Sequence, residues 1–167
     1  MPQDPVETAL DYLKQHQLLL TTAESCTAGA MVALVAEAPG IGEVLESGYV
    51  VYAPSAKERL VGVDPQTIER HGLTSEAVAR EMAQGALKDS QASVAIATTG
   101  VAGPCPEGSV PPGTVCFAWA FAGEPLAVFT CTQRFSGDRS EVMHEAALYG
   151  LSQLAHYHQR WLRGERA

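Results

Sequence analysis

A serine within a run of small residues is the first candidate for chemistry. Residues 21–29 read TTAESCTAG and join a short apolar stretch to an expected helix. Small residues let the backbone turn tightly, and free N–H groups at the start of a helix stabilise an anion such as a phosphate or a tetrahedral oxyanion. Ser25 is therefore a candidate nucleophile for attack on a carbonyl. Two alternatives stay open: Ser25 only caps the helix, or the thiol of Cys26 attacks instead.

Lys57 is the candidate base for that serine. Tyr52 is expected to end a strand and Lys57 to lie in the first turns of the next helix, so that both point at the same edge of a sheet. Burial disfavours an ammonium, and a lysine in a partly apolar pocket can therefore accept the proton of a serine hydroxyl. The alternative is an ordinary surface lysine beside a tyrosine that serves only for packing.

Two further segments could bind the rest of a ligand. The loop at residues 99–113 is rich in glycine and proline, includes Gly100 and Gly103, and follows an expected strand. Such loops commonly line ligand sites in α/β folds, although this spacing is neither a Rossmann fingerprint nor a P-loop. Arg139, at the start of the last helix, could clamp a phosphate through its planar guanidinium. The alternatives are a bare turn and an Asp138 that only caps the helix and pairs with Arg139.

Composition and charge exclude several classes of protein. A chain of 167 residues fits one domain, residues 1–167, and 46% hydrophobic with 18% charged residues is typical of a globular protein. The net charge is −8 and no run of lysines or arginines occurs, which argues against nucleic-acid binding. The apolar stretches are shorter than the ~20 residues of a membrane span, and the N-terminus lacks a signal-peptide pattern. We therefore expect a cytoplasmic protein without membrane contact.

The four cysteines give no support for a metal or redox site. Cys26, Cys105, Cys116 and Cys131 form no CxxC pair and have no neighbouring histidine at ligand spacing. This pattern predicts free thiols in a reducing compartment and no metal ion.

Hydrophobic periodicity predicts helices and strands in alternation, followed by two adjacent strands. Strands are expected at residues 18–23, 48–52, 93–98, 114–121 and 126–135, the last two as an antiparallel pair. Helices are expected at residues 6–15, 30–38, 55–60, 65–70 and 74–88. One last helix from near Asp138 carries Met143, Ala147, Leu151 and Leu154 on its core face, and His158 beyond them is expected at the surface. The pattern favours a single-domain α/β sandwich with a mixed sheet flanked by helices.

Taken together, these segments make the chain similar to the CinA C-terminal domain family, which includes the stand-alone PncC nicotinamide-nucleotide amidases. The resemblance runs from about Leu18 to the end of the final helix. It is carried, in order, by TAESCT at 22–27, Tyr52 with Lys57, Gly62-Val63, TGVAGP at 99–104, PGTV at 112–115 and FSGDR at 135–139. Several independent motifs in the right order are far more specific than any one of them.

The resemblance implies a Ser-Lys hydrolase that converts nicotinamide mononucleotide to nicotinate mononucleotide and ammonia. By position, Ser25 attacks the carboxamide carbon, Lys57 takes the serine proton, and Tyr52 assists that transfer. Substrate binding is expected from Thr27, Gly29 and Thr99 around the oxyanion, from Gly100 and Gly103 in the glycine loop, and from Arg139 near the phosphate. The resemblance implies a small-molecule nucleotide substrate, no metal or organic cofactor, and assembly into homo-oligomers.

Some residues depart from the usual pattern of that family. Ala28 stands where a second glycine is usual, Ala53-Pro54 replaces Ser-Asn, and Cys105-Pro106-Glu107 lies where an Asp-Gly-Gly stretch is usual. A proline at 54 fixes its own φ and removes one backbone donor. Two alternative functions follow. One is an altered or inactive relative that binds a nucleotide or acts as an oligomeric regulatory partner, and the other is an amidohydrolase for a different small amide.

Overall fold

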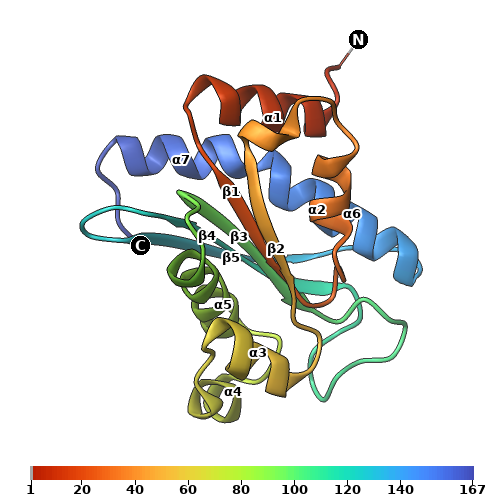
Figure 1. Cartoon of the computed structure of the whole chain (residues 1–167). Helices are drawn as coiled ribbons and strands as arrows, with labels where there is room; N and C mark the ends of the chain where they lie inside the picture. The colour runs from red at the N-terminus through yellow and green to blue at the C-terminus, as the bar shows by residue number, and fades with distance from the viewer. Residues whose placement is uncertain (1) are drawn as a thin grey trace.

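The computed structural model describes residues 2–167, which form a five-stranded mixed sheet between two layers of helices (Figure 1). The strand order is β2-β1-β3-β4-β5. β1 runs parallel to β2 and β3, whereas β4 is antiparallel to both of its neighbours. The strands are β1 (Leu20–Glu24), β2 (Leu45–Val50), β3 (Val94–Gly100), β4 (Thr114–Phe121) and β5 (Ala127–Arg134). The expected α/β sandwich with a mixed sheet is confirmed.

Side-chain size alternates along the central strands, so the two faces of the sheet differ. β4 places Phe117, Trp119 and Phe121 in one core, and cysteine and alanines in the other. β3 repeats the pattern with Ile96 in the first core and Ala97 in the second. Alternate residues of a strand point to opposite faces, so this spacing of large and small residues decides which face each core occupies.

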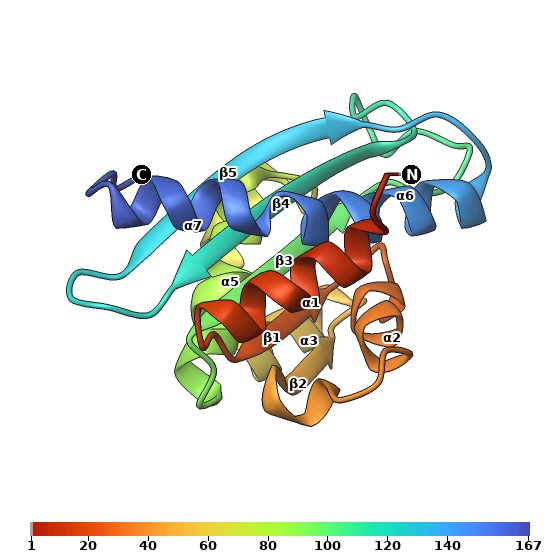
Figure 2. The same cartoon turned by 90° about the horizontal axis from the view of Figure 1, so that it is seen from above.

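The face with the aromatic residues is covered by α1 (Pro5–Gln15), α2 (Ala30–Ala36), α6 (Arg139–Ser152) and α7 (Leu154–Leu162). Figure 2 shows α6 and α7 following one another along the sheet, with α1 beside them. Pro5 at the first turn and Asp4, whose side chain accepts from Val6 N, explain where α1 begins. A short 3₁₀ helix, Ile41–Glu43, leads from α2 into β2.

The face with the small residues is covered by α3 (Pro54–Val61), α4 (Pro65–His71) and α5 (Glu76–Asp89). Alanines on the sheet allow α5 to pack closely over β3 and β4 through Met82 and the alanines of its own buried stripe. At Gly85, α5 touches the backbone of Val61 at the end of α3. α5 therefore fixes the position of α3, the helix that carries Lys57.

The last helix is interrupted, which corrects the expectation of one continuous helix from Asp138. It ends at Ser152 and resumes at Leu154 as α7. Trp119 Nε1 donates to the carbonyl oxygen of Gly150 at 2.9 Å. A side-chain donor at a helix carbonyl competes with the intrahelical bond, and we attribute the break at Gln153 to this contact.

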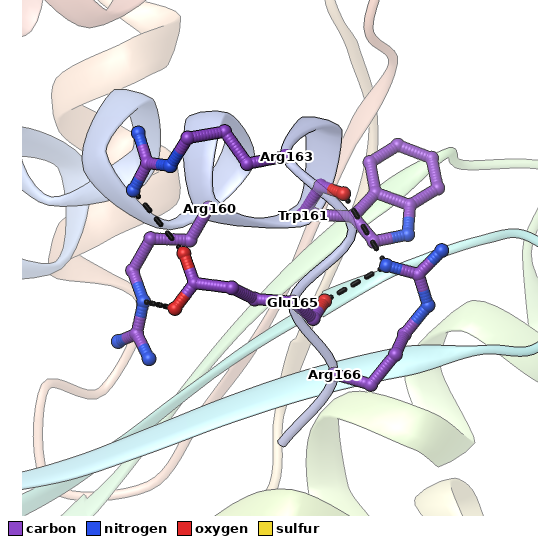
Figure 3. A network of polar contacts seen from close by, with 5 residues as sticks. All are labelled: Arg160, Trp161, Arg163, Glu165 and Arg166. Carbon is purple, nitrogen blue, oxygen red and sulfur yellow. Dashed lines mark hydrogen bonds and ion pairs between the residues drawn. The ribbon is translucent and has the colours of Figure 1, made fainter.

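His158 lies in the core, which corrects the expectation of a surface position. It is 3% exposed, and its Nδ1 lies 2.8 Å from the hydroxyl of Tyr12 on α1. Burial lowers the pKa of His158, with the nearby His16 acting in the same direction. Polar contacts connect the chain beyond α7 to that helix (Figure 3). Glu165 forms ion pairs with Arg160 and Arg163.

β2 begins three residues earlier than expected, at Leu45 rather than at 48. Its residues alternate between half-buried and exposed, because successive side chains point to opposite faces and this edge strand is covered less completely than β1 and β3. Such a strand lacks the continuous apolar run by which β1 and β3 are recognised. No helix within residues 2–167 is long and apolar enough to cross a bilayer.

A glycine-to-alanine pair tests the packing of α3 on α5. A Cβ at position 85 would collide with the carbonyl oxygen of Val61 and lie 2.9 Å from its Cα. Alanine is favoured over glycine within a helix by up to ~1 kcal/mol, but overpacking typically costs about 1–3 kcal/mol, so we expect Gly85→Ala to destabilise. The melting temperature should fall by several degrees, at roughly 2–4 °C per kcal/mol for a chain of this size.

Gly42→Ala is the control, because a Cβ there meets nothing within 4 Å. Thermal unfolding followed by circular dichroism checks both variants. A Gly85→Ala protein at least as stable as the wild type would contradict the close contact.

Candidate active site

All four sequence motifs converge on one edge of the sheet. β1, β2 and β3 are parallel and end there, and the register pairs Gly100 with Val115 and Thr114 with Arg134. The start of β4 and the end of β5 therefore lie at the same edge. The helices that follow β1 and β2 cover opposite faces, so these neighbouring strands form a topological switch point, the place where open α/β sheets commonly bind ligands.

Ser25 and Lys57 meet at this switch point. Ser25 follows β1 directly, and Lys57 lies in the first turn of α3. Lys57 Nζ lies 2.8 Å from Ser25 Oγ, and the two residues are 2% and 7% exposed, respectively. Nζ also donates to the carbonyl oxygens of Val51, at 3.0 Å, and Tyr52, at 2.7 Å. The backbone that follows β2 thus binds the amine of Lys57, which lies on the next helix.

These three partners suit a neutral amine. A neutral lysine has two N–H groups and one lone pair, and the two carbonyls of Val51 and Tyr52 accept the two hydrogens. The lone pair then faces Ser25 Oγ, whose O–H donates to it. In the ammonium form the third hydrogen donates to Oγ instead. One proton can therefore move between the two side chains with the heavy atoms in place.

Burial lowers the pKa of Lys57, and Cys26 and Glu107 act in the opposite direction. The Cys26 contribution requires a thiolate. Burial raises the pKa of that thiol to about 12, Glu24 adds to the rise, and Lys57 opposes it. Near neutral pH, Cys26 is therefore a neutral thiol, a weak nucleophile, and no counter-charge for Lys57. Only the exposed carboxylate of Glu107 then opposes the loss of the lysine proton.

Glu24 is the main residue of the site that the sequence reasoning left without a role. It is 0% exposed, and its carboxylate accepts from Met31 N at 2.8 Å and Val32 N at 3.0 Å. The hydroxyls of Thr22, at 3.1 Å, and Thr27, at 2.7 Å, also donate to it. Glu24 thus occupies the first amides of α2, which are unavailable to a ligand. An acidic residue ending an apolar strand was the available signal.

The turn between Glu24 and α2 contains two left-handed residues. Ala28 has φ +51° and Gly29 has φ +92°. Ser25 N donates to Thr98 O at 3.0 Å, and Ala28 N donates to Ser25 O at 3.0 Å. The hydrogen bonds within residues 2–167 include none that the N–H groups of Cys26, Thr27 and Gly29 donate to another residue. These three amides of the turn are the candidate donors for an oxyanion, and those of Cys26 and Thr27 directly follow the serine.

Other predicted residues contribute in different ways. The side chain of Tyr52 is 61% exposed, and its carbonyl rather than its hydroxyl contacts Lys57. Thr99 Oγ1 donates to Leu73 O at 2.9 Å, so that hydroxyl is already in use. Gly100 lies in β3, where a Cβ would be 2.8 Å from Val115 Cα, so close strand packing explains this glycine.

Gly103 and Arg139 are brought together from two separate motifs. A Cβ on Gly103 would collide with Nη2 of Arg139 and lie 2.9 Å from its Cζ. The guanidinium is therefore packed against the glycine loop, and Arg139 is exposed at the start of α6. Asp138 caps this helix through a capping box with Glu141. The cap expected of Asp138 is confirmed, whereas the ion pairs within residues 2–167 do not include the alternative pairing of Asp138 with Arg139.

A groove of about 510 Å³ lies elsewhere, between α1 and α2, with acidic residues and Lys14 on its rim. It contains none of the predicted site residues and no serine or cysteine. Within the described part of the chain, no three histidine, cysteine, aspartate or glutamate side chains are grouped so that they could hold a metal ion.

The model of the CinA C-terminal domain family matches residues 3–158. The chain belongs to this family. The nicotinamide-nucleotide amidohydrolase PncC of Escherichia coli K12 is 41% identical over 144 residues, which are 85% of this chain and 86% of that protein. Protein YdeJ of the same organism is 38% identical, over 90% of this chain and 89% of its own. The CinA-like protein of Chlorobaculum tepidum is 42% identical, but the chain spans only 36% of its length.

Solved structures of the CinA superfamily have the same fold. The CinA superfamily protein of Escherichia coli gives a TM-score of 0.86 at 36% identity, over 92% of this chain and 88% of that one. The competence damage-inducible protein A (ComA) of Klebsiella pneumoniae gives 0.88 at 33% identity, over 95% of this chain and 99% of that one.

Two departures from the CinA pattern have opposite physical consequences. Pro54 is the first residue of α3, where the backbone N–H has no intrahelical partner and the φ of proline suits the helix. The lost donor therefore costs nothing there. Ala28, in contrast, holds a left-handed φ that glycine would adopt without strain.

Ala28→Gly should therefore stabilise this CinA domain. Relief of a left-handed alanine is worth about 1–2 kcal/mol, and the extra freedom of glycine in the unfolded chain takes back about 0.4–1 kcal/mol. We expect a net gain of up to ~1.6 kcal/mol in the free energy of unfolding. Ala33→Gly, at an exposed position within α2, should instead destabilise by about 1 kcal/mol. Urea denaturation measures both, and a loss of stability in both variants would show that position 28 is unstrained.

Proposed function

We propose that this chain is a nicotinamide-nucleotide amidohydrolase, with Ser25 as nucleophile and Lys57 as base. The observation that carries the proposal is the buried 2.8 Å contact between Oγ and Nζ. The name of the PncC relative, 41% identical over most of both chains, supports the substrate. The contact provides a nucleophile next to a group that can take its proton, which amide hydrolysis requires.

The first half of the proposed reaction forms an ester. Ser25 Oγ attacks the carboxamide carbon of nicotinamide mononucleotide while its proton passes to Lys57 Nζ. The carbonyl π electrons move to oxygen, and the N–H groups of Cys26 and Thr27 stabilise this oxyanion. As the C–N bond breaks, Lys57 returns the proton to the leaving nitrogen and ammonia departs. The product at this stage is a nicotinoyl ester of Ser25.

The second half hydrolyses that ester. A water molecule gives a proton to Lys57 and attacks the same carbon, and the same amides hold the second oxyanion. When the C–O bond to Ser25 breaks, Lys57 returns the proton to Oγ, and nicotinate mononucleotide leaves. These steps use side chains and backbone amides throughout.

The remaining predicted residues would surround the substrate. Gly29 allows the tight turn after Ser25, and Gly103 allows the guanidinium of Arg139 to lie against the glycine loop, where its planar fork suits a phosphate. The exposed ring of Tyr52 stands beside the carbonyl that binds Lys57. A cytoplasmic location, expected from composition, and a homo-oligomeric assembly, expected from the family resemblance, stay predictions.

Removal of either member of the pair should abolish ammonia release. Ser25→Ala removes the nucleophile, and Lys57→Met removes the base while keeping an unbranched side chain. We expect each to lower kcat by at least ~10³-fold, because the two groups act as a unit. Lys88→Met, at an exposed position of α5, is the control and should retain activity.

Ammonia release from nicotinamide mononucleotide is measured by a coupled glutamate dehydrogenase assay. Full activity of Ser25→Ala, together with inactivity of Cys26→Ala, would show that the nucleophile is the thiol of Cys26 and not the hydroxyl of Ser25. Binding of the mononucleotide by calorimetry without product in the wild type would favour the non-catalytic relative. Turnover of a different amide in a substrate panel, without turnover of the mononucleotide, would show that the chain is an amidohydrolase for another substrate.

The pH profile follows from the buried amine. Only neutral Lys57 can accept the proton, so kcat/KM should rise with pH and level off above the pKa of Lys57. Burial lowers that pKa, so the rising limb should be centred below the ordinary 10.5 of lysine. Glu107 raises the pKa, and Glu107→Gln should therefore shift the limb toward lower pH.

Glu43→Gln is the matched control, because this exposed carboxylate is not among the charges that act on Lys57. Initial rates across the pH range give the profiles of the wild type, Glu107→Gln and Glu43→Gln. A limb centred at or above 10.5 would be inconsistent with a base that burial has made less basic.

A further inference from the structure

We infer that Glu24 is a positioning residue that holds the turn carrying Ser25 in its reactive geometry. The inference rests on the proposed function, because it assigns Glu24 a part in the same reaction. Glu24 is fully buried and immediately precedes the serine, yet it points away from Lys57 into a set of four donors. Burying a carboxylate is costly unless hydrogen bonds replace its water, and here they come from β1, from Thr27 in the turn and from the start of α2.

Glu24 replaces an ordinary helix cap. The residue before α2 is Gly29, which has no side chain to cap the helix. The Glu24 carboxylate instead accepts from Met31 N and Val32 N, the second and third residues of α2. The end of β1 is thereby bound directly to the start of α2. The five residues from Ser25 to Gly29 must then span a fixed gap.

A chain of hydroxyls ties the same turn to β3. Thr27 Oγ1 donates to Glu24 and lies 2.8 Å from Thr98 Oγ1. The only hydrogen of Thr27 Oγ1 is used by the carboxylate, so Thr98 is the donor in the second bond. Thr98 also accepts from Ser25 N through its carbonyl oxygen. Ser25 is therefore held by β3 on its N–H side, and Thr27 is held by Glu24 and Thr98 together.

In the proposed mechanism the amides of Cys26 and Thr27 hold the oxyanion, and both belong to this turn. The first amides of α2 are used by Glu24, so the oxyanion must be held by the turn itself. A shift of about 1 Å in a catalytic group can cost about 10²-fold in rate. Loosening the turn should therefore lower kcat, which depends on the oxyanion donors, while leaving KM nearly unchanged.

The test compares threonine variants with and without the hydroxyl. Glu24→Gln keeps the size of the side chain but turns an NH₂ group toward two of the donors. Thr27→Val removes the hydroxyl link, and Thr27→Ser keeps it. Thr21→Val is the control for lost stability: Thr21 is equally buried on β1, but its hydroxyl bonds to Ser47 instead. Each protein is assayed for kcat, KM, melting temperature and the rate at which a fluorophosphonate labels Ser25.

For Glu24→Gln we expect kcat to fall by about 10²-fold with KM within about threefold of the wild type. In Thr27→Val the kcat should fall by about tenfold or more, and in Thr27→Ser it should fall far less. Labelling rates should follow kcat, because the probe needs the same serine, base and amides. Thr21→Val should have a lower melting temperature than the wild type but the same kcat.

A Glu24→Gln protein with the kcat of the wild type would overturn the inference, as would an equal loss of kcat in Thr21→Val and Thr27→Val. If Glu24→Gln does not fold, the three threonine variants decide by themselves. A wild type that releases no ammonia defeats the proposed substrate, but labelling rates still test the position of Ser25. A wild type that is not labelled defeats the Ser-Lys pair.

Discussion

The amine of Lys57 is out of contact with water, and the rest of the site depends on what replaces that water. Two backbone carbonyls and one serine hydroxyl do so, and none of them carries a charge. A buried ammonium with only neutral partners is disfavoured, and the same three contacts suit a neutral amine well. The contact between Lys57 and Ser25 thus depends on the way β2 continues into α3. Close packing of α5 on α3 keeps that path in place.

The buried acid next to Ser25 is kept apart from the buried base. A Glu24–Lys57 ion pair would hold the lysine in its charged form and remove the base. Within residues 2–167 the ion pairs are instead those of Glu165 with Arg160 and Arg163, at the surface. The carboxylate of Glu24 is satisfied by two amides and two hydroxyls on one side of the turn. In the proposed mechanism the turn therefore separates the positioning carboxylate of Glu24 from the amine of Lys57, which takes the proton.

The sequence predicted the parts of this structure that depend on local pattern. Apolar runs and glycine-rich breaks located β1, β3, β4 and β5, and motif order indicated the family and the Ser25–Lys57 pair. Features set by a single tertiary contact were missed. The break after Ser152 depends on the indole of Trp119, and the burial of His158 depends on Tyr12 of α1. The role proposed for Glu24 was not predictable from the sequence, because it depends on α2 folding back over the end of β1.

The residues that depart from the CinA pattern show why a substitution near a site must be judged by its backbone position. Pro54 is unusual in sequence, yet it occupies the one turn of α3 in which proline is well tolerated, three residues before the base. Glu107 lies in an exposed loop and acts on Lys57 only through its charge. Ala28 alone imposes strain, and it does so in the turn that Glu24 and Thr98 restrain from both sides. A strained backbone persists only where its surroundings over-determine it, so the rigidity that we assign to Glu24 also explains how an alanine is accommodated at that position.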